Sequence, residues 1–428
     1  MTALYGRYLH VQGIPAYVVQ GQEGRVYIDP LWHRDLRHHS FLGAEITVLC
    51  PRIVVTRVAG HLEEFAEPGF TFLPLPAPCS TLRYFATGRI LKAALAIWRG
   101  VGSADVVFSQ VVDHPIPLGW MAMPMARLRG ATSYTYLEGT PWRKSPFLRY
   151  SPKFLVRSWV TERVNRVALR CLTFAFITQP AYADLLAPGC PCLVSPASWF
   201  LLSEMSAAPV AQDDDTTLDD RTHLLFVGRL EQAKGVQMLL DALAAIDRPA
   251  NSKLAFTMVG DGRMRATVEG ASARLRHISL HLAEPVDYGP DYFALFSGID
   301  ALVLANLTSE QPRNVYEAWS QGVPVLASNT TGLTSIVVHD QTGLLFDVGS
   351  TAGLTAAIER LMTPDAKRRL RAMGVAGYEV AKGYDHVEMH RRRRRWLTEP
   401  AQAALSGRRR QARNAWTRPT DSTVSLLD

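Results

Sequence analysis

The stretch LLFVGRLEQAKG at residues 224–235 decides the fold, because a short apolar run ends there in a loop opened by glycine. Runs of the same kind follow at residues 255–259 (AFTMV), 301–305 (ALVLA) and 324–328 (PVLAS). Short continuous apolar runs are typical of strands buried on both faces of a parallel sheet. We therefore expect a parallel sheet in the second half of the chain.

A stretch with helical period separates the first two runs. Residues 235–246 place apolar side chains at i, i+3, i+4, i+7 and i+8, namely Val236, Leu239, Leu240, Leu243 and Ala244. This alternation of strand and helix predicts an α/β, doubly wound, Rossmann-like domain. Apolar runs in the first half predict a second domain of this kind; they lie at residues 46–49, 53–55, 106–108 and 174–177.

The composition is that of a folded protein with a large core, since 47% of the 428 residues are hydrophobic and 20% are charged. Five cysteines without paired CxxC spacing argue against a zinc ribbon or a disulfide framework and favour a reducing compartment. The N-terminus lacks the pattern of a secretory signal, and no apolar run of about 20 residues is long enough to span a membrane. We therefore expect a cytoplasmic protein.

Charge and composition divide the chain. Residues 1–200 carry 20 basic against 12 acidic residues, and residues 351–428 carry 16 against 8. A polar, acidic stretch between the two halves reads as an exposed linker. The expected parts are an N-terminal domain at 1–205, this linker at 206–220, a C-terminal domain at 221–380, a basic helix at 381–398 and a disordered basic tail at 399–428.

Two cations follow the first apolar run. Gly228 and Arg229 come directly after it, and Lys234 stands at the start of the next helix. A guanidinium, an ammonium and helix N-terminal amides together suit a phosphate or diphosphate. A solvated loop with surface cations is the alternative. Gly260 follows the second run and allows close backbone approach, although such a turn is also common between ordinary strands and helices.

The loop after the third run, residues 306–314 (NLTSEQPRN), opens a helix that we expect to start near Val315. Glu317 lies in the first turn of this helix, where its carboxylate suits two vicinal hydroxyls of a ribose. Asn314 and Glu317 also have the spacing of a capping box, in which Glu317 caps its own helix. Both interpretations of Glu317 stay open.

The chain resembles one family in four segments taken in order: LLFVGRLEQAKG, FTMVGDGRMR, IDALVLANLTSEQPRNVYEAWSQGVPVLAS and TGLTSIVVHDQTGLLFDVGS. They are similar to the donor domain of the retaining glycosyltransferases of family four, or glycosyl transferases group 1, over residues 224–350. The resemblance implies the GT-B fold, two Rossmann-like doubly wound domains facing a central cleft. It also implies a nucleotide-sugar donor, no metal or other cofactor, and a basic helix at 381–398 that crosses back to the first domain.

The resemblance assigns roles to the candidate residues. It implies that Arg229 and Lys234 hold the diphosphate and neutralise the charge that develops on it, and that Glu317 holds the ribose. The family's other acid precedes the second by eight positions, which falls on Ser309. Glu310, seven positions before, would contact the donor sugar after a one-residue deletion in the loop.

Further donor contacts follow from the same resemblance. Arg313 is expected as a third phosphate-directed cation, and the Asn314 and Val315 amides are expected at the helix mouth. Gly228 and Gly260 line the donor side. The acidic runs at residues 213–215 and 219–220 lie in the linker, so no metal-binding Asp-x-Asp element is assigned.

The first half departs from the family pattern. The glycine-rich loop that such enzymes often have after their first strand is not visible near residues 12–22. Sugar-facing or acceptor-facing candidates are Glu138, where many relatives place a histidine before glycine, and His114. A histidine followed by proline also has an ordinary structural reading.

Two basic stretches point to partners. Residues 143–170 contain basic residues, aromatic and aliphatic side chains and the single acid Glu162, which suits an anionic bilayer surface. The alternative is a helix that packs its apolar side on its own domain. The arginine run at residues 391–395 suits lipid or nucleic-acid phosphates, or pairs with acids of the first domain. No nucleic-acid-binding motif accompanies it, so nucleic acid is not an expected partner.

These observations predict a retaining glycosyltransferase that moves a sugar from a nucleotide diphosphate to a hydroxyl of a glycan or lipid-linked acceptor, as in cell-envelope or exopolysaccharide synthesis. Such an enzyme would be cytoplasmic, with a peripheral position on the inner face of the plasma membrane. A nucleotide-sugar epimerase and a non-catalytic nucleotide-sugar-binding or membrane-associated assembly protein are the alternatives.

Overall fold

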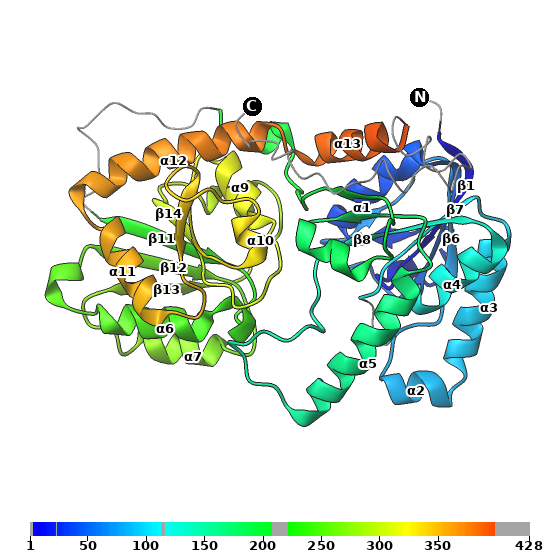
Figure 1. Cartoon of the computed structure of the whole chain (residues 1–428), viewed down its shortest axis with the longest axis horizontal. Helices are drawn as coiled ribbons and strands as arrows, with labels where there is room; N and C mark the ends of the chain where they lie inside the picture. Colours follow the sequence, from blue (N-terminus) through cyan, green and yellow to red (C-terminus); the bar gives the residue numbers. More distant parts are fainter. Residues whose placement is uncertain (1–2, 23, 113–115, 208–220, 399–428) are drawn as a thin grey trace. The chain divides into compact units, whose positions relative to one another are not determined.

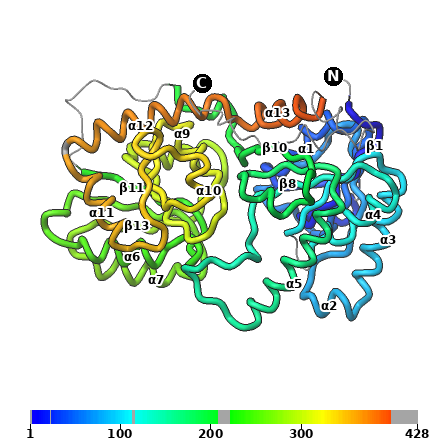
Figure 2. The backbone as a smooth tube through the Cα atoms, in the orientation of Figure 1, coloured from blue at the N-terminus to red at the C-terminus, as the bar shows by residue number. Residues whose placement is uncertain are grey.

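The computed structural model describes residues 3–22, 24–112, 116–207 and 221–398. The chain folds into two compact units (Figure 1). Among the described residues, the first unit comprises 3–143, 152–195 and 389–398, and the second comprises 144–151 and 196–388. Figure 2 traces the path of the chain through both.

The division differs from the expected boundaries at 205 and 380. Residues 196–205 belong to the second unit, and residues 389–398 belong to the first. A short segment within the N-terminal half, Lys144–Ser151, also belongs to the second unit. The expected linker from residue 208 and the expected tail at 399–428 lie outside the described residues.

A parallel six-stranded sheet forms the second unit, in the order β13-β12-β11-β14-β15-β16. Four of these strands correspond to the expected apolar runs. The strands are β11 (Thr222–Val227), β12 (Leu254–Val259), β13 (Ser279–Ala283), β14 (Ala301–Leu304), β15 (Val325–Ser328) and β16 (Gly343–Phe346).

Helices cover both faces of this sheet. On one face, Leu239 and Leu354 pack in a core with Phe256; on the other, Phe293 and Trp319 pack with Leu302. The helical elements are η4 (Gln232–Lys234), α6 (Val236–Ala245), η5 (Pro249–Asn251), α7 (Arg265–Ser272), α8 (Pro290–Ala294), α9 (Asn314–Ser320), α10 (Thr331–Thr334), α11 (Thr351–Leu361) and α12 (Pro364–Lys382); η3 (Leu202–Glu204) precedes them.

The buried face of α6 differs in part from the expected one. Val236, Leu239, Leu240 and Leu243 are buried as expected, but Ala244 is exposed. The helix packs over a neighbouring arc that also buries Met238 and Ala242.

The first unit is built on a ten-stranded sheet with the path β10-β9-β8-β7-β1-β4-β2-β3-β5, and β6 pairs with β4. The expected runs at 46–49 and 53–55 lie in one long strand, β4. The strands are β1 (Tyr5–Val11), β2 (Ala16–Val19), β3 (Tyr27–Ile28), β4 (Gly43–Val55), β5 (Glu63–Glu64), β6 (Phe70–Leu75), β7 (Val106–Ser109), β8 (Thr132–Leu137), β9 (Phe174–Ile177) and β10 (Cys192–Val194). All pairings are parallel except those of β3 with β2 and β5.

Helices also cover both faces of the first sheet. Ile97, Ala122 and Leu169 lie in cores on one face, and Trp32 and Leu397 lie in the core of the other. The helical elements are α1 (Pro30–Arg37), η1 (His38–Phe41), α2 (Thr81–Ala86), α3 (Arg89–Gly102), α4 (Gly119–Arg129), α5 (Pro152–Leu169), η2 (Pro180–Leu185) and α13 (His386–Thr398). No helix within the described ranges has both the length and the apolar character needed to cross a membrane.

Helix α5 packs its apolar residues on its own domain only in part. Ala168 and Leu169 are buried there in a hydrophobic core. The polar Ser158 and Asn165 are buried as well, whereas Val156 and Trp159 are exposed. Asn165 is tolerated inside because its Oδ1 accepts a hydrogen bond from Trp120 Nε1 at 2.5 Å.

The arginine run of α13 is partly used inside the first unit. Arg393 is buried, donates from Nε to Ser195 Oγ at 3.0 Å, and places its guanidinium 4.3 Å from the centre of the Tyr136 ring. One turn earlier, His390 Nε2 lies 3.0 Å from Asp35 Oδ1. These contacts attach the C-terminal helix to the sheet of the first unit.

Candidate functional site

The loops that follow β11 and β12 touch through their backbones. The Gly228 amide donates to the Val259 carbonyl at 3.0 Å. A Cβ on Gly260, whose φ is +147°, would lie 2.0 Å from the Gly228 carbonyl oxygen. Glycine is therefore required at Gly260, and the two loops form one surface at the carboxyl end of the sheet, where open α/β sheets bind ligands.

Lys234 ends η4 and lies immediately before α6. The turn into the helix is made by Gly235, which has a φ of +72° and whose absent Cβ would lie 1.9 Å from the Ala305 carbonyl oxygen. The Leu307 amide donates to the Ala233 carbonyl at 2.9 Å. The Lys234 loop is thus held against the chain that leaves β14.

Lys234 and Glu310 form an ion pair in this structure. Lys234 Nζ donates to Glu310 Oε1 at 2.7 Å, and the two side chains are 17% and 30% exposed. Thr308 Oγ1 donates to the same oxygen at 3.3 Å. Burial of Glu310 opposes its ionisation, but Lys234, Arg229 and Thr308 outweigh burial and lower the pKa of this carboxyl. The spacing that is one residue short of the family pattern therefore still brings Glu310 to the lysine.

The backbone of Glu310 is fixed by another close approach. A Cβ on Gly332, in α10, would lie 2.2 Å from the Glu310 carbonyl oxygen. The loop between β14 and α9 therefore has contacts on both sides, with the Lys234 loop and with α10.

Arg229 is the more open of the two cations. Its side chain is 67% exposed, and Nη1 lies 3.6 Å from Glu231 Oε2. Arg229 is close enough to Glu310 to contribute to the lowered pKa of that acid. The structure therefore places Arg229, Lys234 and Glu310 together, with Arg229 facing solvent.

The start of α9 is bound to the end of β11. Asn314 Nδ2 donates to the Val227 carbonyl at 3.0 Å, which ties the helix to the strand that precedes Gly228. Helix α9 begins at Asn314, one residue before the expected start. The Val315 amide lies 3.5 Å from the Pro312 carbonyl oxygen, to which it donates inside the turn, and the Val315 side chain is buried.

Glu317 does not cap its own helix. Its side chain is 1% exposed, Oε2 accepts a hydrogen bond from Tyr292 OH, and Oε1 lies 3.6 Å from Arg313 Nε. No side-chain capping bond is present at the N-cap position Arg313. Burial raises the pKa of Glu317, and Arg313 and Tyr292 oppose that rise. The capping-box interpretation is therefore wrong.

Arg313 stands between Glu317 and a group of aromatic rings. Its guanidinium lies 5.8 Å from the ring centres of both Trp199 and Tyr288, and its side chain is 45% exposed. The cation therefore contacts the buried acid and is also open to solvent. Tyr292 was not found from the sequence, because it lies 25 positions before its partner, with no spacing pattern to mark it.

The two candidates of the first unit are not placed relative to this site. Glu138 directly follows β8 at the carboxyl end of the first sheet, and its side chain is exposed. His114 lies outside the described residues.

A segment that sequence reasoning missed reaches the loop before Glu310. Ser145 Oγ, in the segment Lys144–Ser151, donates to the Leu307 carbonyl, and the Ser145 side chain is largely buried. Tyr150 OH accepts from the Ser145 amide at 2.8 Å, and the Phe147 ring fills the space where a side chain at Gly349 would lie. The segment lies in the basic stretch at residues 143–170, for which a bilayer surface was the expected partner, and no motif in it predicts the contact with Leu307.

The second unit resembles a known protein family. Residues 221–364 match the family model Glycosyl transferases group 1. The lipopolysaccharide core biosynthesis glycosyltransferase LpsD of Rhizobium meliloti is 31% identical over 176 residues, which are 39% of this chain and 47% of LpsD. The chain thus spans about half the length of this curated relative. The family resemblance expected from the sequence is confirmed for the second unit.

Solved structures extend the likeness to nearly the whole chain. Sucrose-phosphate synthase of Thermosynechococcus elongatus has a TM-score of 0.67 at 15% identity and covers 93% of this chain and 100% of its own. Anabaena HepE, solved in complex with UDP, has a TM-score of 0.62 at 14% identity and covers 92% and 99%. At this identity the likeness establishes the fold alone, and it confirms the expected GT-B class.

Proposed function

Because residues 221–364 belong to the glycosyl transferases group 1 family, we propose that the chain is a retaining glycosyltransferase with a nucleotide-diphosphate-sugar donor. The observation that carries the proposal is the ion pair of Lys234 with Glu310, beside Arg229, at the carboxyl ends of β11 and β14. The complex of HepE with UDP supports a donor of this class.

Arg229 and Lys234 would act on the leaving group. The bond that breaks joins the anomeric carbon to a phosphate oxygen, and its electron pair stays on the nucleoside diphosphate. A guanidinium and an ammonium fixed beside the developing charge stabilise it without reorganisation. Lys234 suits this role because Glu310 holds its ammonium in place, and Arg229 because its guanidinium is exposed to an incoming ligand. With both charges supplied by side chains, the proposal includes no metal.

The two acids would have different tasks. Glu310, ionised beside Lys234, is proposed to contact hydroxyls of the donor sugar. Glu317 is proposed to hold the ribose, with Tyr292 and Arg313 fixing its orientation. Buried carboxylates oriented by such partners recognise hydroxyls through charge-assisted hydrogen bonds.

The acceptor is proposed to be a hydroxyl of a glycan or lipid-linked molecule of the cell envelope. The name of LpsD, a glycosyltransferase of lipopolysaccharide core biosynthesis, supports this class. Glu138, at the carboxyl end of the first sheet, is the proposed acceptor-facing or sugar-facing residue of the first unit, together with His114.

The test compares Arg229→Ala and Lys234→Ala with Lys382→Ala, which removes an equal charge from an exposed lysine of α12 in the same unit. UDP-sugars and GDP-sugars are supplied with a chelator, with and without glycan acceptors, and the released nucleotide and products are measured. We expect each site variant to turn over donor about 100-fold more slowly, with wild-type rates for the control.

Wild-type rates for both site variants would refute the assigned roles. Isomerised nucleotide-sugar formed without an acceptor would indicate an epimerase instead. Donor binding without transfer or hydrolysis would indicate a binding protein. A product with the same configuration at the anomeric carbon as the donor would support a retaining mechanism.

A further inference from the structure

Four helices of the first unit form one layer on one face of its sheet. The strands β1, β7, β8 and β9 are adjacent and parallel, so α4 and α5, the right-handed crossovers that link β7 to β8 and β8 to β9, fall on the same side. Helix α3 packs against α4, α4 against α5, and α2 against α3. These neighbouring helices can be followed in Figure 1, and we call the outer surface of α2, α3, α4 and α5 the helix-layer face.

This face exposes large apolar side chains in ordered stripes. On α3, Leu91, Leu95 and Trp98 follow the spacing i, i+4 and i+7, which is one side of a helix. On α5, exposed side chains follow the spacing i, i+3, i+4 and i+11 from Val156 to Val167. The exposed apolar residues of the face are Leu82, Phe85, Leu91, Leu95, Trp98, Leu128, Leu155, Val156, Trp159, Val160 and Val167.

The exposure is large enough to demand an explanation. Leu82 is 82% exposed, Leu91 71% and Trp159 59%. In α5 the usual order holds only in part: the polar Ser158 and Asn165 are buried beside Ala168 and Leu169. Val156 and Trp159 of the same helix are exposed. Single exposed apolar residues are ordinary, but contiguous stripes on neighbouring helices mark an interaction surface.

The charged residues of the same helices are basic with one exception. Their sequences contain ten Lys and Arg residues and the single acid Glu162. The basic residues are Arg83, Arg89, Lys92, Arg99, Arg127, Arg129, Lys153, Arg157, Arg163 and Arg166.

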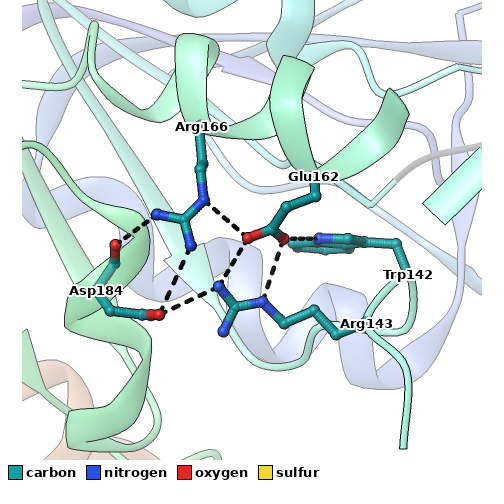
Figure 3. Close-up of polar contacts among 5 residues, drawn as sticks. All are labelled: Trp142, Arg143, Glu162, Arg166 and Asp184. Carbon is teal, nitrogen blue, oxygen red and sulfur yellow. Dashed lines mark hydrogen bonds and ion pairs between the residues drawn. The ribbon is translucent and has the colours of Figure 1, made fainter. Parts of the chain in front are cut away.

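Glu162 is neutralised within the first unit (Figure 3). Its carboxylate accepts from Arg143 Nη2 at 2.9 Å, Arg166 Nε at 2.8 Å and Trp142 Nε1 at 2.6 Å. Asp184 also lies on these arginines, 3.3 Å from Arg143 Nη2. The single acid of the four helices is thus paired with residues of the first unit. The other charged side chains of these helices are positive.

Two cations lie over the exposed tryptophans. Arg129 lies 3.9 Å from the centre of the Trp98 ring, and Arg163 lies 4.6 Å from that of Trp159. Tryptophan with adjacent Arg or Lys is the combination enriched at membrane interfaces, where the ring enters the headgroup layer and the cation meets phosphate.

We propose that the helix-layer face docks on the surface of an anionic phospholipid bilayer. The stripes supply buried apolar area, and the excess of cations supplies attraction to anionic headgroups. A second copy of the chain fits less well, because two such faces would bring like charges together. The proposal goes beyond the transfer reaction and does not depend on it, since none of these residues belongs to the donor site.

The test is sedimentation of the full chain with vesicles of phosphatidylcholine alone or with about 30% phosphatidylglycerol. Three variants are compared with the wild type: Trp98→Ser with Trp159→Ser, Lys92→Glu with Arg157→Glu, and a control, Leu202→Ser with Arg274→Glu. The control changes an exposed leucine and an exposed arginine of the second unit. Circular dichroism and donor turnover verify that each variant is folded.

We expect the wild type and the control to bind anionic vesicles at least tenfold more tightly than neutral ones. The tryptophan variant should lose at least fivefold in binding to anionic vesicles, and the charge variant at least tenfold. Equal binding by all four proteins, or no binding by the wild type, would overturn the proposal. A dimer in solution that both face variants dissolve, without any vesicle binding, would assign the face to a second copy instead.

Discussion

Gly235 fixes the position of Lys234 by having no side chain. Its φ of +72° is costly for other residues, and the Ala305 carbonyl occupies the place of a Cβ. We expect Gly235→Ala to destabilise the second unit by about 2 to 4 kcal/mol, because strain and overpacking add. Thermal unfolding followed by circular dichroism measures this loss.

The matched control is Gly270→Ala in α7. There an added Cβ meets nothing closer than Arg274 Nη1 at 3.8 Å, and the backbone is helical. Alanine at such a position should stabilise by about 0.5 to 1 kcal/mol. If both variants melted at the same temperature, the close approach of the Ala305 carbonyl would not be the reason that position 235 requires glycine.

Single functional residues were predictable from the sequence where a charged side chain comes soon after an apolar strand. Arg229 and Lys234 were predicted because they come directly after an apolar run, and the structure brings them together with Glu310. The partner of Glu317 was not predictable. Tyr292 reaches it through the packing of α8 on α9, and contacts between separate helices leave no periodic trace in one sequence.

The segment Lys144–Ser151 contacts the loop that precedes Glu310. No periodic pattern in the sequence reveals this segment. Ser145 Oγ donates to the Leu307 carbonyl, and the Leu307 amide is bound to Ala233, next to Lys234. We expect Ser145→Ala to lower donor turnover about threefold to tenfold by loosening the Lys234 and Glu310 loops, with donor KM less affected than kcat.

Ser297→Ala is the control, since that serine is an exposed residue of the same unit and lies outside the donor loops. Steady-state kinetics with varied donor separates kcat from KM, and Ser145→Thr, which keeps the hydroxyl, should restore part of kcat. A Ser145→Ala enzyme with wild-type kcat would show that the segment only fills space.

Among the elements, the strands made mostly of apolar residues were the ones that could be predicted from the sequence. Strands β11, β12 and β14 are buried on both faces and were visible as apolar runs. Strands β1 and β8 are as central, but they carry buried Tyr and His side chains that hydrogen-bond to one another, and β8 also buries Ser133 and Thr135. Neither strand therefore reads as an apolar run. The packing of helix α5 was not predictable for another reason, because Val156, Trp159 and Val167 point outward while Ala168 and Leu169 are buried.

The first unit buries a cluster of hydroxyl, imidazole and carboxyl groups. Beneath α1 and α13, the first unit holds a polar cluster in which Tyr8 OH lies 2.9 Å from His10 Nδ1, 2.8 Å from His39 Nδ1 and 2.9 Å from Tyr134 OH. Asp35 completes the cluster, 3.3 Å from His39 Nε2. Burial, followed by the nearby His39, lowers the pKa of His10 to about 3. The folded first unit therefore keeps His10 neutral.

Acid should consequently weaken the first unit before the second. Between about pH 6.5 and 3 the unfolded chain protonates His10 and the folded chain does not, so the free energy of unfolding falls as pH falls. At pH 5 the loss is about 2 kcal/mol. Burial opposes ionisation of Asp35, but His39 and His390 hold its pKa well below the ordinary value, so its stabilising contribution is lost only at lower pH.

Hydrogen exchange by mass spectrometry, corrected for the intrinsic rate, measures this difference between the units. From pH 7 to pH 5, protection in β1 and β8 should fall while protection in β11 and β12 changes little. His10→Gln keeps hydrogen-bonding capacity but does not titrate, so its first unit should lose less protection over the same range. An equal loss in both units, or an unchanged slope in the variant, would show that His10 does not set the acid response.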